Sequence, residues 1–140
     1  MKIYLCATRP EEKTHQWVSN MAVFNGLVED TEAVSIICDN FVSCFTHEEL
    51  VGFFEKIVSK MRLNSELVIM HPDIHMLSHR LYREEIDMQA LNDILFKNGA
   101  IKSVCSVEKI QQAMPSNIQI THQNFDMTTS IITIKATRTQ

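Results

Sequence analysis

Two apolar runs flanking one amphipathic segment dominate the hydrophobic pattern of this chain. Residues 33–38 are apolar apart from Ser35, which is typical of a strand covered on both faces in a parallel sheet. The second run, residues 66–70, follows a polar turn at Asn64 and Ser65. The pattern predicts two parallel strands joined by a right-handed helical crossover.

The segment between the two runs has helical spacing. Thr46 and Glu49 match a capping box, in which two side chains satisfy free N–H groups of a first helical turn. An apolar stripe follows at i, i+3, i+4, i+7, i+8 and i+11: Leu50, Phe53, Phe54, Ile57, Val58 and Met61. The opposite face is charged, so we expect the stripe to pack on the sheet.

Further strands are predicted on both sides of this unit. Residues 2–7 indicate a short central strand. The interval before residue 33 is too short for a full set of βα units, so we expect the N-terminal part of the fold to be truncated. Residues 118–122 and 127–137 have strand-like apolar patterns, joined by Gln-Asn-Phe-Asp, and predict an antiparallel hairpin.

Two shorter helices are predicted before that hairpin. Asp87 caps the first and Gly99 ends it. Its inward positions are expected to be Met88, Leu91, Ile94 and Leu95. Ser106 opens the second helix, which stops at Pro115. The elements together predict an α/β fold with a Rossmann-like, mostly parallel sheet and a C-terminal antiparallel β-hairpin.

Length and composition narrow the class of protein. A chain of 140 residues is one domain by size, over residues 1–140. The net charge of −4 with no basic block disfavours nucleic-acid binding. Four cysteines without a CxxC pair favour a reduced protein of the cytoplasm. No run of eighteen apolar residues occurs, so no membrane span is expected.

Polar residues stand at the ends of both central strands. Asp39 and Asn40 follow the first, and His71 and Asp73 follow the second. Because the carboxyl ends of neighbouring parallel strands meet at the edge where ligands bind, we expect these four to lie close together as candidate catalytic residues. They could supply a general base or bind substrate, or they could only satisfy helix N-termini.

A metal site is the weaker interpretation of the same region. His71 and His75 lie four residues apart with Asp73 between them, a spacing at which two imidazoles can chelate Zn²⁺. Pro72, however, holds His71 in an extended conformation, so the two rings need not share a helix face. We therefore expect no metal, and metal-dependent activity is the third hypothesis.

The order of motifs is informative. The chain reads KIYLCAT, WVSN, LVEDTEAVSIICDNFVSCF, MRLNSELVIMHPDI and LNDILFKNGAIKS. This order resembles a short, truncated branch of the class I S-adenosylmethionine-dependent methyltransferases, with its LGCG turn, WINVD segment, LPFEDNSVDEIYASHVLEHF-type strand, LKPGG, VPDL and LxxILF. The resemblance spans essentially the whole chain. It implies a methyltransferase-type fold and S-adenosylmethionine as the cofactor.

The resemblance also implies where the cofactor would lie. The family's cofactor-cradling glycines are replaced here by Leu5, Cys6, Ala7 and Thr8. Trp17 flanks the same place and could stack on an adenine. The family's ribose-binding acid is missing, because WVSN leads to Met21. The side chains of Cys6 and Ala7 would occupy space that the methionine end of the cofactor needs.

Two functions follow from the resemblance. The first is methylation of a small molecule or sugar, with Asp39 or His71 as the base. The second is a methyltransferase-like subunit that has lost its cofactor site and binds a protein partner, for instance a second copy in a homodimer. We expect Trp17 or Met21 to fill the cofactor space, whereas an open cleft between Thr8, Asp39 and His71 would favour the enzyme.

Overall fold

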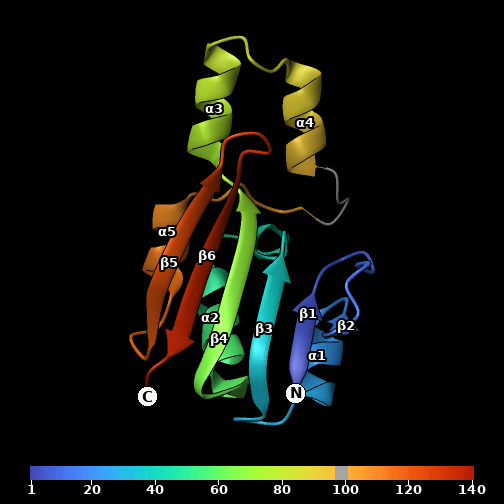
Figure 1. Ribbon diagram of the computed structural model, residues 1–140, viewed down its shortest axis with the longest axis vertical. Coiled ribbons are helices and arrows are strands. Elements are labelled where there is room, and N and C mark those ends of the chain that lie inside the picture. The colour runs from blue at the N-terminus through green and yellow to red at the C-terminus, as the bar shows by residue number, and fades with distance from the viewer. Residues whose placement is uncertain (97–100) are drawn as a thin grey trace.

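The computed structural model describes residues 1–96 and 101–140, and its strands form one mixed sheet in the order β2-β1-β3-β4-β6-β5 (Figure 1). The strands are β1 (Lys2–Leu5), β2 (Gln16–Val18), β3 (Ala33–Asp39), β4 (Met61–Pro72), β5 (Ile118–Asp126) and β6 (Ile131–Arg138). The first four are parallel neighbours, and β6 pairs antiparallel with β4 and β5. The predicted sheet with its C-terminal hairpin is confirmed.

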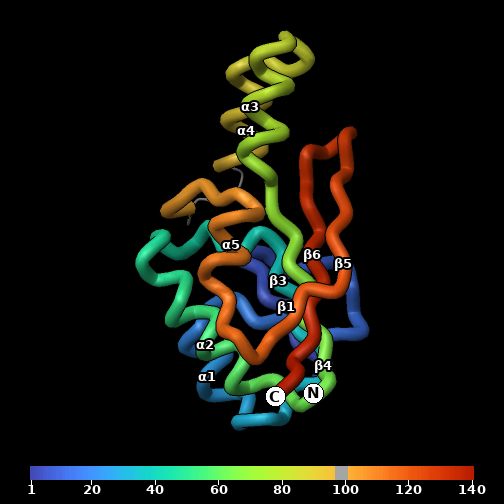
Figure 2. Tube along the Cα trace, turned by 90° about the vertical axis from the view of Figure 1, so that its left-hand side faces the viewer, coloured from blue at the N-terminus to red at the C-terminus, as the bar shows by residue number. Residues whose placement is uncertain are grey.

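The helices fall into two groups. They are α1 (Met21–Leu27), α2 (Leu50–Lys60), α3 (Ile74–Tyr82), α4 (Met88–Phe96) and α5 (Val107–Ala113), and a short 3-10 turn, η1 (Val42–Cys44), precedes α2. In both views α1, α2 and α5 lie against one face of the sheet, while α3 and α4 project beyond the carboxyl end of β4 (Figures 1 and 2). Among the described residues, helices thus cover only one sheet face.

The core lies between the sheet and α2. The predicted stripe is buried throughout, with Leu50, Phe54 and Ile57 fully inaccessible to solvent. Its facing layer comes from alternate strand positions such as Ile36 and Leu67, as expected for one covered face. The prediction that β3 is covered on both faces is wrong, because α1, α2 and α5 lie on one face of the sheet (Figure 1) and the alternate positions Ser35, Ile37 and Asp39 are only half-buried.

The boundaries differ from prediction at four places. The first strand ends at Leu5 rather than at residue 7. The helix begins only at Leu50: the Thr46 hydroxyl accepts the Glu49 N–H at 3.3 Å, but Glu49 makes no reciprocal side-chain cap. Instead of turning before residue 66, β4 begins at Met61 and passes through Asn64, which has a positive φ of 62°. The β5–β6 turn falls at residues 127–130 rather than 123–126, because β5 continues to residue 126.

Helix α4 departs most from its predicted role. It forms where expected, with the Asp87 carboxylate accepting the Ala90 N–H at 2.8 Å. None of its residues is buried, however, although four were expected to face inward. The predicted end at Gly99 lies outside the described residues. An apolar helix in this position is therefore left without a core.

Candidate functional site

The carboxyl ends of β1, β3 and β4 border an open cleft of about 560 Å³. The chain leaves β1 toward β2 on one side and meets β3 on the other, so the cleft lies at a reversal of strand order, where α/β sheets usually bind ligands. Its volume is in the range of small-molecule sites. The polar and thiol side chains along it belong to Cys6, Thr8, Asp39, Asn40, His71, Arg80, Thr128 and Thr129.

Three of the four predicted catalytic residues line this cleft. Asp39, Asn40 and His71 follow adjacent strands and converge there, as the parallel register requires. Asp73 is instead committed to α3: its Oδ2 accepts the Met76 N–H at 3.0 Å as the N-cap, and the residue is buried. It lines a different pocket, between α3 and the β5–β6 hairpin.

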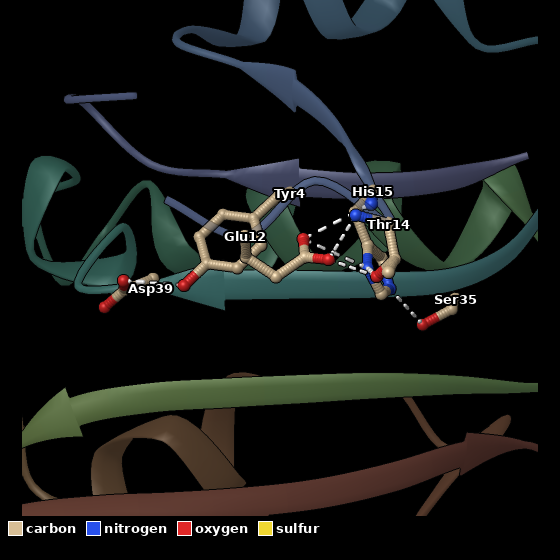
Figure 3. Close-up of polar contacts among 6 residues, drawn as sticks. All are labelled: Tyr4, Glu12, Thr14, His15, Ser35 and Asp39. Carbon is tan, nitrogen blue, oxygen red and sulfur yellow. Dashed lines mark hydrogen bonds and ion pairs between the residues drawn. The ribbon is translucent and has the colours of Figure 1, made fainter. Parts of the chain in front are cut away.

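Asp39 is held in place from β1. The Tyr4 hydroxyl donates a hydrogen bond of 2.9 Å to its Oδ2 (Figure 3). Burial and the neighbouring carboxylate raise the pKa of the Tyr4 phenol well above its ordinary value, so that Tyr4 remains a donor at any physiological pH. One oxygen of Asp39 is therefore fixed, and its carboxylate is positioned at the cleft without a cationic partner in the described salt bridges.

Asn40 shapes the turn after β3. Its φ is 48°, in the left-handed region that asparagine tolerates better than most residues. Its backbone N–H donates to the Met70 carbonyl at 2.8 Å, and its side-chain oxygen accepts the Ser43 hydroxyl at 2.9 Å. These bonds join the ends of β3 and β4, so a structural role accounts for Asn40 even without a ligand.

His71 is buried at the inner end of the cleft and is 3% exposed. Among the described residues no hydrogen bond of ordinary geometry reaches either ring nitrogen, although the backbone of Cys105 lies near the ring. Burial lowers the pKa of His71 to about 4. The ring is neutral at pH 7, but a base with so low a pKa takes up protons poorly near neutrality.

The five predicted cofactor residues separate in the structure. Cys6 and Thr8 line the cleft, whereas the Leu5 side chain is fully buried in the core. Ala7 is half-buried and does not line the cleft. Trp17 lies on the edge strand β2, is 38% exposed, and its Nε1 donates to the Cys6 carbonyl at 2.9 Å.

Sequence reasoning missed a polar network that holds residues 6–15 against the sheet (Figure 3). His15 lies 3.3 Å from Glu12 through Nδ1 and 3.1 Å from the Ser35 hydroxyl through Nε2. Glu12 also accepts hydrogen bonds from the backbone and hydroxyl of Thr14. The E-x-T pattern could have indicated this local turn, but nothing in the sequence marks the contact with Ser35, twenty positions away.

This network has the residue types of a serine nucleophile with its base, but it lacks a further requirement. Acyl transfer needs free N–H donors that stabilise the oxyanion. Ser35 lies within β3, where Lys2 of β1 and Glu66 of β4 are its pairing partners on the two sides. The nearby N–H of His15 donates to Glu12 at 3.2 Å. The network therefore fastens the loop to β3.

The described residues offer no group of three or more His, Cys, Asp or Glu side chains that could hold a metal ion. His71 is buried at the end of β4, whereas His75 is largely exposed on α3, with its Nε2 3.6 Å from Glu108. Asp73 is engaged as a helix cap. The residues proposed for a metal site thus serve three separate purposes.

The residues of the cleft do not fit S-adenosylmethionine bound as the resemblance implies. Residues 6–15 contain no helix and no glycine, so no helix N-terminus faces the cleft after β1. The Cys6 N–H donates to Val18 across the β1–β2 pair. Beyond β2, where the resemblance would place an acid for the ribose, the Asn20 side chain caps α1 by accepting the Val23 N–H at 2.9 Å.

The expectation that this space is filled is nevertheless wrong in part. Trp17 bonds the end of β1 on the β2 side, but the cleft between Thr8, Asp39 and His71 is open. The cleft therefore has room for a small ligand, although it lacks the groups that the resemblance implies for binding S-adenosylmethionine.

Comparison with known proteins places the fold. No model of a protein family matches the chain, and no curated protein is similar to it in sequence. A crystal structure described as a SAM dependent methyltransferase from Archaeoglobus fulgidus matches with a TM-score of 0.56 and 12% identity, over 97% of this chain and 75% of that chain. At this identity the match shows the methyltransferase-type α/β fold and nothing further.

No helix within residues 1–96 and 101–140 is long and apolar enough to cross a bilayer.

Proposed function

We propose that this chain is a methyltransferase-fold protein that does not use S-adenosylmethionine and acts as a binding and assembly subunit. The observation that carries the proposal is the connection after β1. Residues 6–15 form a loop without helix or glycine, pinned to β3 through His15 and Ser35. In this fold that connection would have to hold the charged end of the cofactor.

The energetic reason is the cost of burying polar groups. S-adenosylmethionine carries a carboxylate and two ribose hydroxyls, and each loses water on binding unless the protein replaces its hydrogen bonds. A helix N-terminus supplies such bonds through free N–H groups and its dipole. Here the Cys6 N–H and carbonyl are already bonded to Val18 and Trp17. These two backbone groups therefore cannot replace the hydrogen bonds to water that the cofactor loses on binding.

The cleft itself supports binding of some smaller ligand. Asp39 and Arg80 bring opposite charges to it, and Thr8, Thr128 and Thr129 add hydroxyl groups. Arg80 is held by hydrogen bonds to the Thr128 carbonyl and the Ser130 hydroxyl. Met70, Pro72, Ile94 and Ile131 also line the cleft, so a small molecule with an apolar body and a few polar groups matches it.

The second candidate is an active methyltransferase, favoured by the open cleft between Thr8, Asp39 and His71. Methyl transfer depends mainly on placing the acceptor and needs little acid or base chemistry. Asp39 would then be the base for a hydroxyl acceptor, because the low pKa of His71 disfavours that residue.

Thermal unfolding with millimolar S-adenosylmethionine or S-adenosylhomocysteine separates the candidates. A ligand at a hundred times its dissociation constant stabilises the folded state by about 2.7 kcal/mol, which raises Tm by several degrees. We expect no change with either compound. A rise with both, but not with adenosine alone, would support the second candidate.

A further inference from the structure

Residues 74–96, here called the arm, form a helical hairpin that stands away from the body of the protein. Its helices α3 and α4 extend past the carboxyl edge of the sheet in both views (Figures 1 and 2). Arg80, in the last turn of α3, donates to the Thr128 carbonyl of the β5–β6 turn at 3.3 Å. This bond ties α3 to the hairpin beside it, and the turn between α3 and α4 projects beyond the sheet (Figure 1).

The arm is apolar but almost unburied. Leu77 is its only buried residue within α3, and α4 has none. Exposure is high for Tyr82 (86%) and Met88 (66%) on the arm and for Met127 (68%) on the adjoining turn, and these are the three most exposed large apolar side chains described. Phe96 and Phe125 extend the same end of the molecule at about half exposure.

Two helices as short as α3 and α4 need packing partners for their apolar faces. Each helix is nine residues long. Isolated helices of this length are marginal in water, and helices in proteins gain their stability from packing an apolar face. In α4 the apolar positions Leu91, Ile94 and Leu95 are half-buried, and Ile94 lines the cleft. Their pattern resembles that of a core helix, and the described chain supplies no core around them.

On the premise that the chain is an assembly subunit, as proposed above, we propose that the arm pairs with the arm of a second copy. A two-fold axis would place α3 of one copy against α4 of the other and enclose the apolar faces in a four-helix arrangement. Such an interface is isologous: the same surface of each copy contacts the same surface of the other.

Charge favours a second copy as the occupant. Helix α3 carries His79 and Arg80 and no acid, whereas α4 carries Asp93 and no base. Glu85, in the turn between them, lies 3.7 Å from Arg80 and 3.3 Å from Arg83. Pairing α3 with α4 across a two-fold axis brings opposite charges together twice. The arm as a whole has four carboxylates and two arginines, so an anionic membrane surface is a poorer match.

The exposed area is also of the right size. Tyr82, Met88, Phe96, Phe125 and Met127 together expose on the order of 600 Å², taking roughly 200 Å² for a fully exposed large side chain. A stable interface buries about 800 Å² per partner. The remainder can come from the polar flanks of the two helices.

Light scattering during size exclusion tests the pairing on the full chain. We expect a mass near twice the 16.1 kDa of the chain at micromolar concentration. Met88→Glu should convert the protein to a monomer with unchanged circular dichroism. Leu63→Glu is the matched control, because Leu63 is 56% exposed on β4 at the opposite end of the sheet and should leave the dimer intact.

A charge exchange tests who the partner is. Asp93→Lys leaves both helices basic, and His79→Glu places a carboxylate on α3 opposite the Asp93 of the second copy, so each variant alone should be monomeric. An equimolar mixture should recover the dimer, because each helix again meets an opposite charge. A monomeric wild-type protein, or a dimer that Met88→Glu leaves intact, would overturn the inference. Neither result depends on S-adenosylmethionine, so the proposed function can fail independently.

Discussion

The hydroxyl of Tyr4 donates to the carboxylate of Asp39 at 2.9 Å and joins the ends of β1 and β3 at the cleft. The register explains the contact: Tyr4 pairs with Ile37, so Asp39 lies two residues further along β3 on the same sheet face. The bond fixes the one carboxylate that follows the central strand. It ties the candidate ligand site to the stability of the sheet.

Tyr4→Phe should lower the free energy of unfolding by about 1–2 kcal/mol, because it removes a partly buried donor to a carboxylate. Urea denaturation measures the loss. Ser116→Ala removes a hydroxyl from an exposed residue outside the arm and should change nothing. Equal stability of the two variants would show that the Tyr4–Asp39 bond is not formed.

His71 predicts a pH dependence of stability. Its pKa is about 4 in the folded protein against 6.5 ordinarily, so the unfolded chain binds the proton more tightly. The contribution is complete above pH 6.5 and is lost as the pH falls toward 4, by about 3 kcal/mol in all. Chemical denaturation from pH 7 to 4 should show this loss in the wild type. The free energy of unfolding of His71→Phe, whose side chain cannot be protonated, should fall by about 3 kcal/mol less than that of the wild type over this range. The same pH dependence in both proteins would contradict the prediction.

Phe54→Ala should cost about 3–5 kcal/mol, since Phe54 is fully buried on α2 and its ring lies 5.1 Å from that of Phe53. Val51→Ala, on the exposed side of the same helix, is the matched control. A loss below about 1 kcal/mol for Phe54→Ala would mean that α2 does not pack on the sheet.

Restoring glycine at the end of β1 tests what the loop lacks. The double variant Cys6→Gly/Ala7→Gly should only destabilise the protein, by about 0.5–1 kcal/mol per glycine plus a small cavity term at Cys6. It should gain no affinity for S-adenosylmethionine, because Trp17 still bonds the Cys6 carbonyl. Binding that appears in this variant alone would show that the two side chains were the only obstacle.

The spacing of apolar residues correctly predicted the central elements of the fold. The stripe of α2 and the alternation in β6 depend on local spacing that one buried face imposes, and the continuous apolar run at residues 33–38 marked the position of β3 but not the exposure of its second face. The cleft position followed from those elements, because parallel strands end at one edge. Asp39, Asn40 and His71 could therefore be placed together from the sequence.

The rest depends on contacts that spacing does not encode. The apolar stripe of α4 indicates a face that packs against other residues, but it does not indicate whether those residues belong to the same chain. The His15–Ser35 contact joins positions twenty residues apart and has no local signature. β2 has only three residues, too few for a periodic pattern. The sequence therefore could not predict that the Trp17 side chain donates a hydrogen bond to the Cys6 carbonyl at the end of β1.

The central claim is that the methyltransferase fold is kept here without its cofactor site. Calorimetric titration of the wild-type chain with S-adenosylmethionine and S-adenosylhomocysteine tests it most directly. The structure predicts no saturable heat with either compound at millimolar concentration, because no helix begins within residues 6–15 to offer free N–H groups and the Asn20 side chain after β2 already caps α1. Saturable binding of one molecule per chain, weakened by Asp39→Asn, would contradict the claim.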